Sequence, residues 1–328
     1  MGIDQLFHQF SSKRILVIGD VMVDAYIRGK VTRVSPEAPV PIVTLEKQED
    51  RLGGAANVAV NLVAMGAQAV VCSVIGNDAN SQVLTQLLLD SGISGDGLIQ
   101  SETRKTTVKT RVIGNNQQLL RVDSEQTNPI SSAEGEALVN RVNKLMDEGC
   151  DGIIFEDYNK GVLTPEVIQH IIKRANERGI PTAVDPKKDN FLAYQGVTLF
   201  KPNLKELKEG LGIEFSFVNE KQKFENAVQL LETKLSNTIS FVTLSEHGVY
   251  IKQGSESVYC PAHVRNIADV SGAGDTVISL ATLCLICQAP LALIAEVSNI
   301  AGGLVCETSG VVSIDSSQLL AETDRLIK

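Results

Sequence analysis

The chain has 328 residues and a formal net charge of -9, and its lysines and arginines form no basic block. This balance argues against a nucleic-acid partner. The N-terminus lacks the apolar core of a signal peptide, and no apolar stretch reaches the ~18 residues of a membrane span, so we expect a cytoplasmic protein without membrane insertion. Hydrophobic residues make up 43% and aromatic residues only 4%, which favours an aliphatic core such as a buried parallel sheet.

Apolar runs rich in β-branched residues alternate with helical patterns along most of the chain. The expected strands are 15–18, 69–75, 152–155, 182–184, 198–200 and 239–244. The expected helices are 54–66, 79–91, 132–148, 164–178, 203–211, 220–235, 272–287 and 291–306. This alternation predicts an α/β fold with a doubly wound, mostly parallel sheet flanked by helices, in a single domain over residues 1–328.

Two stretches break this pattern. Residues 22–50 and 105–123 alternate apolar and polar side chains, and the second contains a turn at Gly114, Asn115 and Asn116. Both are interpreted as antiparallel strands outside the main sheet. Because they interrupt the domain, we expect a small β-strand lid over the edge of the active site.

The cysteines offer little chemistry. Only Cys284 and Cys287 have CxxC spacing, and they lie inside an apolar helical pattern without a second pair or a histidine pair nearby. We therefore expect buried helix cysteines here in preference to a metal or redox site.

A segment of small residues precedes the long apolar helix at 272–287. Gly272, Ala273 and Gly274 leave the first N–H groups of this helix open to an anion, as in a phosphate cradle. Asp275 then falls in the first helical turn, beside the anion position. On position alone, an acidic residue that complements the helix dipole is the commoner explanation.

A second glycine-initiated helix follows Gly53 and Gly54, with Asn57 in its first turn. The two glycines allow a ligand to approach the backbone, although alone they indicate an ordinary turn into a helix. Upstream, Asp24 lies beyond the first strand, at the kind of edge where open α/β sheets bind ligands.

The segments 53–62 and 269–275 together resemble the two signatures of the ribokinase-like (PfkB) carbohydrate kinases. This resemblance implies that Asp275 takes the proton from the acceptor hydroxyl and that the amides of residues 272–274 form an anion hole. It assigns sugar binding to Asp24, Gly53, Gly54 and Asn57. It also implies that ATP and Mg²⁺ are the cofactors. A requirement for a monovalent cation such as K⁺ stays open, because Val270 replaces the usual Thr of the second signature.

The same resemblance supplies candidates for the nucleotide-binding residues. Asn203 and Glu206 alone form a helix-capping pattern, but the family's Asn-x-x-Glu motif implies that they position Mg²⁺ through water and lie near the nucleotide phosphates. A strand-turn segment, by itself only a hairpin turn, supplies the nucleotide-binding candidates Ser245, Glu246 and Gly248. Asn299 is a further candidate near the adenine.

The lid sequences at 31–41, 110–112 and 117–123 resemble those of one branch of the family, the D-glycero-β-D-manno-heptose 7-phosphate kinases of lipopolysaccharide-precursor synthesis. This branch implies phosphorylation of the 1-hydroxyl, and the resemblance to the family as a whole implies a homodimer formed through the lid. It also places Asp157 and Lys160 on the acceptor side and Lys187 near either substrate. A phosphorylated acceptor needs cations, for which the candidates are Arg33, Arg111, Arg121, Lys160 and Lys187. Surface solvation is the alternative for each, and Arg121 has Asp123 as a local partner.

Other functions stay open. A kinase of another sugar, such as fructose 6-phosphate, ribose or a nucleoside, would share the anion hole. A dinucleotide-dependent oxidoreductase or a non-catalytic nucleotide-binding module is disfavoured, since Gly19-Asp20-Val21 stands where a GxGxxG motif would follow the first strand. No Walker A motif is present, and none of the four histidines forms the His-x-Gly-His signature of a fused nucleotidyltransferase. We therefore expect adenylyl transfer to be the task of a separate protein.

Overall fold

The computed structural model describes residues 2–327 and contains a nine-stranded sheet at its centre. The strand order is β13-β12-β11-β10-β9-β8-β1-β4-β5, and the pairs from β11 to β5 are parallel. These strands are β1 (Arg14–Gly19), β4 (Gln68–Gly76), β5 (Ser94–Ser101), β8 (Gly152–Glu156), β9 (Thr182–Asp185), β10 (Leu199–Phe200), β11 (Ile239–Thr243), β12 (Val249–Gln253) and β13 (Glu256–Cys260). The predicted mostly parallel α/β fold is confirmed, with an antiparallel edge at β12 and β13.

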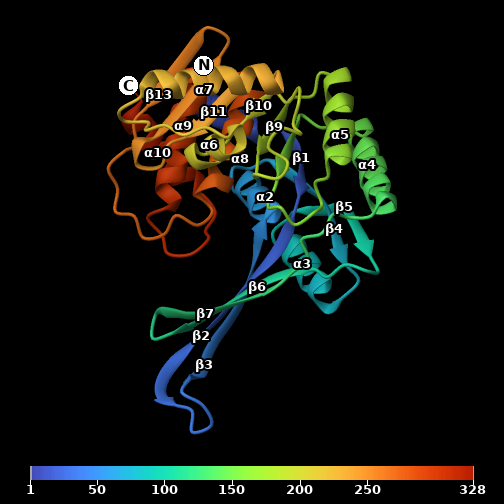
Figure 1. The fold of residues 1–328 in the computed structure, drawn as a ribbon, viewed down its shortest axis with the longest axis vertical. Coiled ribbons are helices and arrows are strands. Elements are labelled where there is room, and N and C mark those ends of the chain that lie inside the picture. Colours follow the sequence, from blue (N-terminus) through green and yellow to red (C-terminus); the bar gives the residue numbers. More distant parts are fainter. Residues whose placement is uncertain (1, 328) are drawn as a thin grey trace.

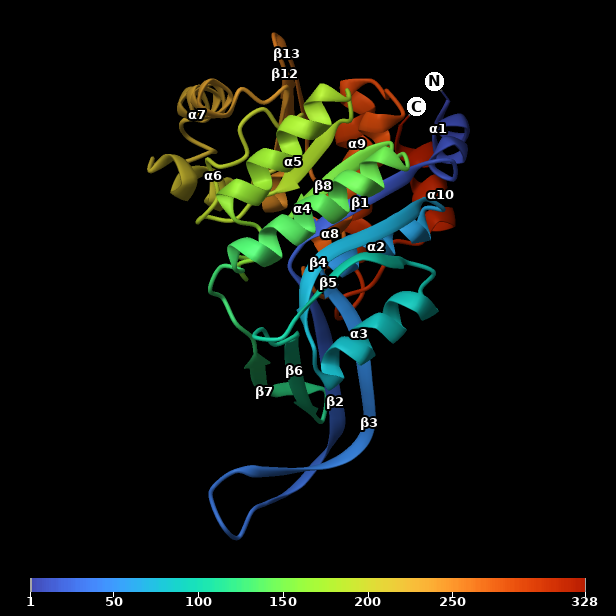
Figure 2. The ribbon, with the colours of Figure 1, turned by 90° about the vertical axis from the view of Figure 1, so that its right-hand side faces the viewer.

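Helices cover both faces of the sheet (Figure 2). One layer contains α1 (Ile3–Phe10), α2 (Ala55–Ala64), α3 (Ala79–Asp90), α8 (Ala273–Ile286), α9 (Leu291–Val305) and α10 (Ser316–Leu326). The other contains α4 (Ser132–Asp147), α5 (Pro165–Glu177), α6 (Leu204–Leu211) and α7 (Lys221–Leu235). Strand β1 shows why both layers are needed: Ile15 and Val17 pack on the first, while Leu16 and Ile18 pack on the second. Alternate side chains of a buried strand point to opposite faces.

The lid is a four-stranded sheet that projects away from the body (Figure 1). Its order is β3-β2-β6-β7, with β2 (Val21–Val34), β3 (Pro41–Gly54), β6 (Thr107–Gly114) and β7 (Gln117–Ser124). Each hairpin is antiparallel as expected, but β2 and β6 pair in parallel, so the expectation of antiparallel strands is wrong for this pair. The reason is topological, because β2 and β6 both continue outward from the carboxyl ends of parallel strands, β1 and β5.

The order of the sheet reverses at β1 and β8. From β1 the chain continues outward to β4 and β5, whereas from β8 it continues in the other direction to β9, β10 and β11. Loops that leave the carboxyl ends of two such strands diverge and form a crevice, which is the usual ligand site of an open α/β sheet. Asp20, Glu156 and Asp185 lie at this edge, at or directly after the ends of β1, β8 and β9.

Two smaller expectations concern the helices. Cys284 in α8 and Cys287 directly after it are free and buried, as the interpretation of core cysteines predicts. Among the helices of residues 2–327, none has both the length and the apolar character that crossing a membrane requires.

Candidate active site

Asp275 lies in the first turn of α8, whose N-cap is Gly272. Gly272 has φ +82°, a left-handed conformation that favours glycine. A Cβ at Gly272 would lie 3.1 Å from Asn57 Nδ2, so a larger residue would crowd the side chain that contacts Asp275. Helical N–H groups without intrahelical partners occur in this first turn, which suits an anion beside Asp275.

Two donors hold the Asp275 carboxylate. Asn57 Nδ2, from α2, donates to Oδ2 at 2.6 Å, and the Tyr158 hydroxyl donates to Oδ1 at 2.9 Å. Burial raises the pKa of Asp275 to about 6; the Asn57 hydrogen bond opposes this shift, and the Asp185 charge adds to it. A carboxyl with this pKa is mostly ionised at neutral pH and remains basic enough to accept a proton.

The loop that carries Tyr158 is fixed by a buried carboxylate. Asp20 accepts hydrogen bonds from the backbone N–H groups of Tyr158, Lys160 and Val162 at 2.9, 3.0 and 3.1 Å. Burial raises the pKa of Asp20, and these three donors counteract the rise. The Asp20 contacts therefore determine where the Tyr158 hydroxyl lies relative to Asp275.

Glu156, Asp185 and Asp275 form a buried acidic group, in which one oxygen of each lies within 4.8 Å of the others. Lys201 Nζ pairs with Asp185 Oδ2 at 2.8 Å. Both carboxylate oxygens of Glu156 are buried without a hydrogen-bond partner in the described chain. Burial, then repulsion from Asp185 and Asp275, raises the pKa of Glu156 well above its ordinary value. Unpartnered carboxylate oxygens in such a group fit a divalent metal ion that prefers oxygen ligands, and Glu156 and Asp185 are the residues that would hold it.

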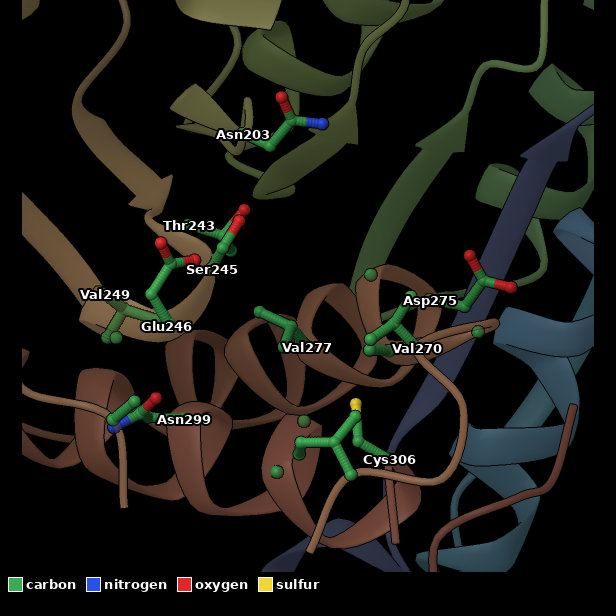
Figure 3. A pocket seen from close by; sticks show the side chains of 18 of the residues that line it. Asn203, Thr243, Ser245, Glu246, Val249, Val270, Asp275, Val277, Asn299 and Cys306 are labelled. Atoms are coloured by element: carbon green, nitrogen blue, oxygen red, sulfur yellow. The ribbon is translucent and has the colours of Figure 1, made fainter. Parts of the chain in front are cut away.

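A cavity of about 790 Å³ extends from Asp275 along α8 to α9 (Figure 3). Val277 lies between the two ends, with Asp275 on one side and Glu246 and Asn299 on the other. The lining includes every predicted anion-hole residue and most of the predicted nucleotide residues: Gly272, Ala273, Gly274, Asn203, Ser245, Glu246, Gly248 and Asn299. The structure thus brings these residues to one cavity that ends at Asp275.

Asn203 and Glu206 form a reciprocal cap at the start of α6. The Asn203 side chain accepts from Glu206 N, and Glu206 Oε2 accepts from Asn203 N, both at 2.8 Å. Lys187 Nζ donates to Glu206 Oε1 at 2.6 Å, so both oxygens of Glu206 are engaged. Burial alone would lower the pKa of Lys187, but the Asp185 and Glu206 carboxylates raise it overall. The capping pattern is what the structure shows, and the metal role of this pair stays a prediction.

Asp24 and Gly53 lie side by side on neighbouring strands of the lid base. A Cβ at Gly53 would collide with Asp24 Oδ2, so glycine is required for the carboxylate to occupy its place. Asp24 is buried and paired with Arg111, which lies on the adjacent strand β6. A role of either residue in sugar binding stays a prediction.

The remaining cation candidates lie in different settings. Arg33 is exposed and lies about 30 Å along β2 from Asp24, so the structure does not bring it to Asp275 within one chain. Arg121 pairs with Asp123 at 2.8 Å, as its local alternative anticipates. Lys160 pairs with Glu125 at 2.7 Å.

The Asp157 carboxylate forms its hydrogen bonds within the loop that follows β8 and with residues packed against that loop. It accepts hydrogen bonds from Asn159 N, Asn190 Nδ2 and Tyr194 Oη at 2.8, 3.0 and 2.8 Å. These bonds give Asp157 a structural role in the loop that presents Tyr158. A direct contact between Asp157 and the acceptor stays a prediction.

Sequence reasoning left four residues of this site without a role: Glu156, Tyr158, Asp185 and Lys201. The available signal was their position, because Glu156 and Asp185 end the adjacent strands β8 and β9. Tyr158 follows Glu156 by two residues, and Lys201 directly follows β10. Their convergence on Asp275 required the three-dimensional fold.

Comparison with solved structures supports the fold. The chain is similar to phosphofructokinase-2 from Escherichia coli, with a TM-score of 0.77 and 18% identity, covering 95% of this chain and 100% of that one. It is also similar to Arabidopsis thaliana ribokinase complexed with ribose and ATP, with a TM-score of 0.71 and 16% identity, covering 94% of this chain and 98% of that one.

Comparison with curated sequences gives nearer relatives. Bifunctional protein HldE of Citrifermentans bemidjiense is 36% identical over 98% of this chain, which covers 65% of that protein. Bifunctional protein HldE of Desulfatibacillum aliphaticivorans is 39% identical over 95% of this chain, which covers 63% of that protein. The chain thus spans somewhat less than two thirds of the length of these relatives. Residues 12–318 match the family described as pfkB family carbohydrate kinase, and the chain therefore belongs to this family of sugar kinases.

Proposed function

We propose that the chain transfers the γ-phosphate of ATP to the 1-hydroxyl of D-glycero-β-D-manno-heptose 7-phosphate, in the cytoplasm, in the synthesis of a lipopolysaccharide precursor. The observation that carries the kinase chemistry is the Asp275 carboxylate, which Asn57 and Tyr158 hold at one end of the cavity that runs along α8 to α9. The choice of acceptor is supported by the resemblance of the lid to heptose 7-phosphate kinases and by the identity of 36% and 39% to two HldE proteins.

The proposed reaction is an in-line displacement. The acceptor oxygen forms a bond to the γ-phosphorus while the bond from that phosphorus to the β,γ-bridging oxygen breaks, and ADP leaves with the electron pair. Asp275 accepts the hydroxyl proton. The N–H groups at the start of α8 stabilise the negative charge of the transferred group, and most of the rate enhancement comes from such positioning and charge stabilisation.

Mg²⁺ is the proposed divalent cofactor, held by Glu156 and Asp185, where it would neutralise charge on the nucleotide phosphates. We also propose a monovalent cation such as K⁺, because the structurally similar phosphofructokinase-2 has been solved in complex with potassium. Replacing K⁺ by tetramethylammonium in the assay tests the requirement for a monovalent cation, and we expect a loss of activity.

The lid is proposed to pair with the lid of a second copy. Strand β7 is an edge strand whose residues are all exposed, and Leu120 and Val122 lie on the face opposite Arg121. Val34 and Leu45 are also exposed on this lid. Leu120→Glu should convert a dimer to a monomer in analytical ultracentrifugation, whereas Leu89→Glu, on exposed α3, should not. A wild-type monomer contradicts this part of the proposal.

A coupled assay of ADP release with a panel of acceptors tests the proposed reaction. Heptose 7-phosphate should give a kcat/KM at least tenfold above fructose 6-phosphate, ribose and a nucleoside. A higher value for fructose 6-phosphate or ribose would reassign the substrate and leave the kinase chemistry intact. Absence of ADP release with every sugar would overturn the proposed chemistry itself.

A further inference from the structure

One face of the lid base gathers charged side chains. In the strand register, Lys109 of β6 lies opposite Asp24 of the parallel strand β2 and opposite Asp123 of the antiparallel strand β7. Arg111 lies two residues after Lys109, and Arg121 lies two residues before Asp123, so alternation places all five side chains on the same face. This face begins beside Gly53, at the entrance to α2, and therefore borders the sugar side of the site.

The ion pairs on and around this face leave one half-buried lysine without a carboxylate. Within 4.0 Å, Arg111 pairs with Asp24, Arg121 with Asp123, and Lys160 with Glu125. Among residues 2–327, no carboxylate lies within this distance of Lys109. Burial, then the positive charge of Lys160, lowers the pKa of Lys109. The carboxylates of Glu125, Asp123 and Asp24 oppose this shift, but each of them forms an ion pair with another cation, which leaves Lys109 able to bind an anion.

Lys109 lies near Asp275 but outside the lining of the cavity along α8. Lys109 Nζ lies 6.0 Å from the centre of the Tyr158 ring, and the hydroxyl of the same ring contacts Asp275. Lys187 and Lys201 line the nucleotide cavity, whereas Lys109 and Lys160 are absent from its lining. Lys109 is therefore separated from the base by one side chain and lies outside the space available to ATP.

We propose that Lys109, with Lys160 beside it, binds the phosphate that the sugar acceptor already carries. This assignment rests on the proposed function, since it presumes an acceptor whose reactive hydroxyl lies at Asp275. The phosphate would lie across the Tyr158 ring from that hydroxyl and would supply the missing counter-charge of Lys109. It would also balance the excess of cations on this face, which carries Lys109, Arg111 and Arg121 against Asp24 and Asp123.

The test is a comparison of phosphorylated and unphosphorylated acceptors. Lys109→Met keeps most of the aliphatic stem and removes the charge. We expect the KM for heptose 7-phosphate to rise about 10- to 100-fold, while the KM for ATP and the kcat/KM for unphosphorylated heptose stay within about twofold. Lys109→Arg should retain most of the preference for the phosphorylated sugar. Lys30→Met, on the same lid and paired with Glu46 at 2.7 Å, should leave all three values unchanged.

The outcomes separate the two hypotheses. If wild-type protein uses heptose 7-phosphate and folded Lys109→Met keeps the same preference for it, the assignment of Lys109 is wrong and the proposed function stands. A rise in the KM for ATP alone would also overturn the assignment. If wild-type protein phosphorylates no phosphorylated sugar, the proposed function fails. Thermal unfolding of each variant shows whether it is folded. If Lys109→Met does not fold, the comparison of acceptors is made with Lys109→Arg.

Discussion

Asn57 and Asp275 are 218 residues apart in the chain, yet Asn57 Nδ2 donates a 2.6 Å hydrogen bond to Asp275 Oδ2. Each residue lies in the first turn of a glycine-capped helix, Asn57 in α2 and Asp275 in α8. The two helices pack against each other under the same edge of the sheet, and Ser279 of α8 donates to Val58 O of α2. The two family signatures thus form one unit, in which a side chain of the first orients the carboxylate of the second, the proposed catalytic base.

Asp275→Asn tests the role of that base. The substitution keeps the shape of the side chain and removes its ability to accept a proton. We expect kcat to fall by about 10²- to 10⁴-fold, with little change in the affinity for ATP, because general-base catalysis contributes on this scale. Steady-state ADP release and calorimetric binding of a nonhydrolysable ATP analogue measure the two quantities. Turnover close to that of wild-type protein would exclude Asp275 as the base.

Tyr158→Phe tests whether the second hydrogen bond to Asp275 matters for turnover. Loss of the hydroxyl should leave the carboxylate free to rotate, so we expect kcat to fall about 10-fold while the KM for ATP stays within twofold. Tyr194→Phe is a matched control, because Tyr194 donates a 2.8 Å hydrogen bond to another carboxylate of the same loop, Asp157. Equal losses in the two variants would show that only the integrity of the loop is being measured.

Much of the fold follows from local patterns. The alternation of apolar runs and helical periods predicted all the parallel strands of the main sheet except β5, and the helices between them, to within a few residues, because buried strands and capped helices have strong local signals. Strand β5, the β12–β13 edge and helices α1 and α10 were not anticipated. Strand β5 contains Gly95 and Gly97, which weaken a strand pattern, and its pairing with β4 includes a register shift.

The site was predictable only where motifs mark it. Asp275 and Asn57 lie in recognisable signatures, whereas Glu156 and Asp185 are single acidic residues at strand ends. Their importance arises from the adjacency of β8 and β9, which is a long-range property of the sheet. Spacing was also insufficient for the cations, because Arg33 and Arg111 are both lid residues but only Arg111 lies at its base.

The raised pKa of Asp275 predicts opposite effects of pH on activity and on stability. Activity needs the ionised carboxylate, so kcat/KM should rise as the pH increases and level off above about 6. The folded-state pKa lies above the ordinary value of 3.8, so the folded protein binds this proton more tightly than the unfolded chain. The contribution of Asp275 to stability is therefore fully present below about pH 4 and is lost as the pH rises through about 6.

Urea denaturation of Asp275→Asn checks the stability effect. Above pH 7 the variant should be more stable than wild-type protein, by an amount on the order of 2 kcal/mol, because it lacks the buried charge. Below pH 4 the difference should disappear. Asp90→Asn, at the exposed end of α3, should show no such pH-dependent difference. Equal stability of wild-type protein and Asp275→Asn at every pH would contradict the raised pKa.

Glu156→Gln tests whether the buried acidic group binds the divalent metal. Its two oxygens are unpartnered in the described chain, so a bound cation should stabilise the wild-type fold. We expect Mg²⁺ to raise the unfolding temperature of wild-type protein without nucleotide, and this effect to be lost in Glu156→Gln. Because the variant lacks one of the two proposed carboxylate ligands, the Mg²⁺ concentration for half-maximal activity should rise about tenfold or more.

Glu232→Gln is the control for this prediction, since Glu232 is a partly buried carboxylate of α7 that pairs with Lys252. Its response to Mg²⁺ should match that of wild-type protein, because a carboxylate that already pairs with a lysine offers no site for a second cation. A Glu156→Gln protein that is stabilised by Mg²⁺ as strongly as wild-type protein would place the metal elsewhere. The Asn203 and Glu206 pair would then be the next ligands to test, with Glu206→Gln measured in the same way.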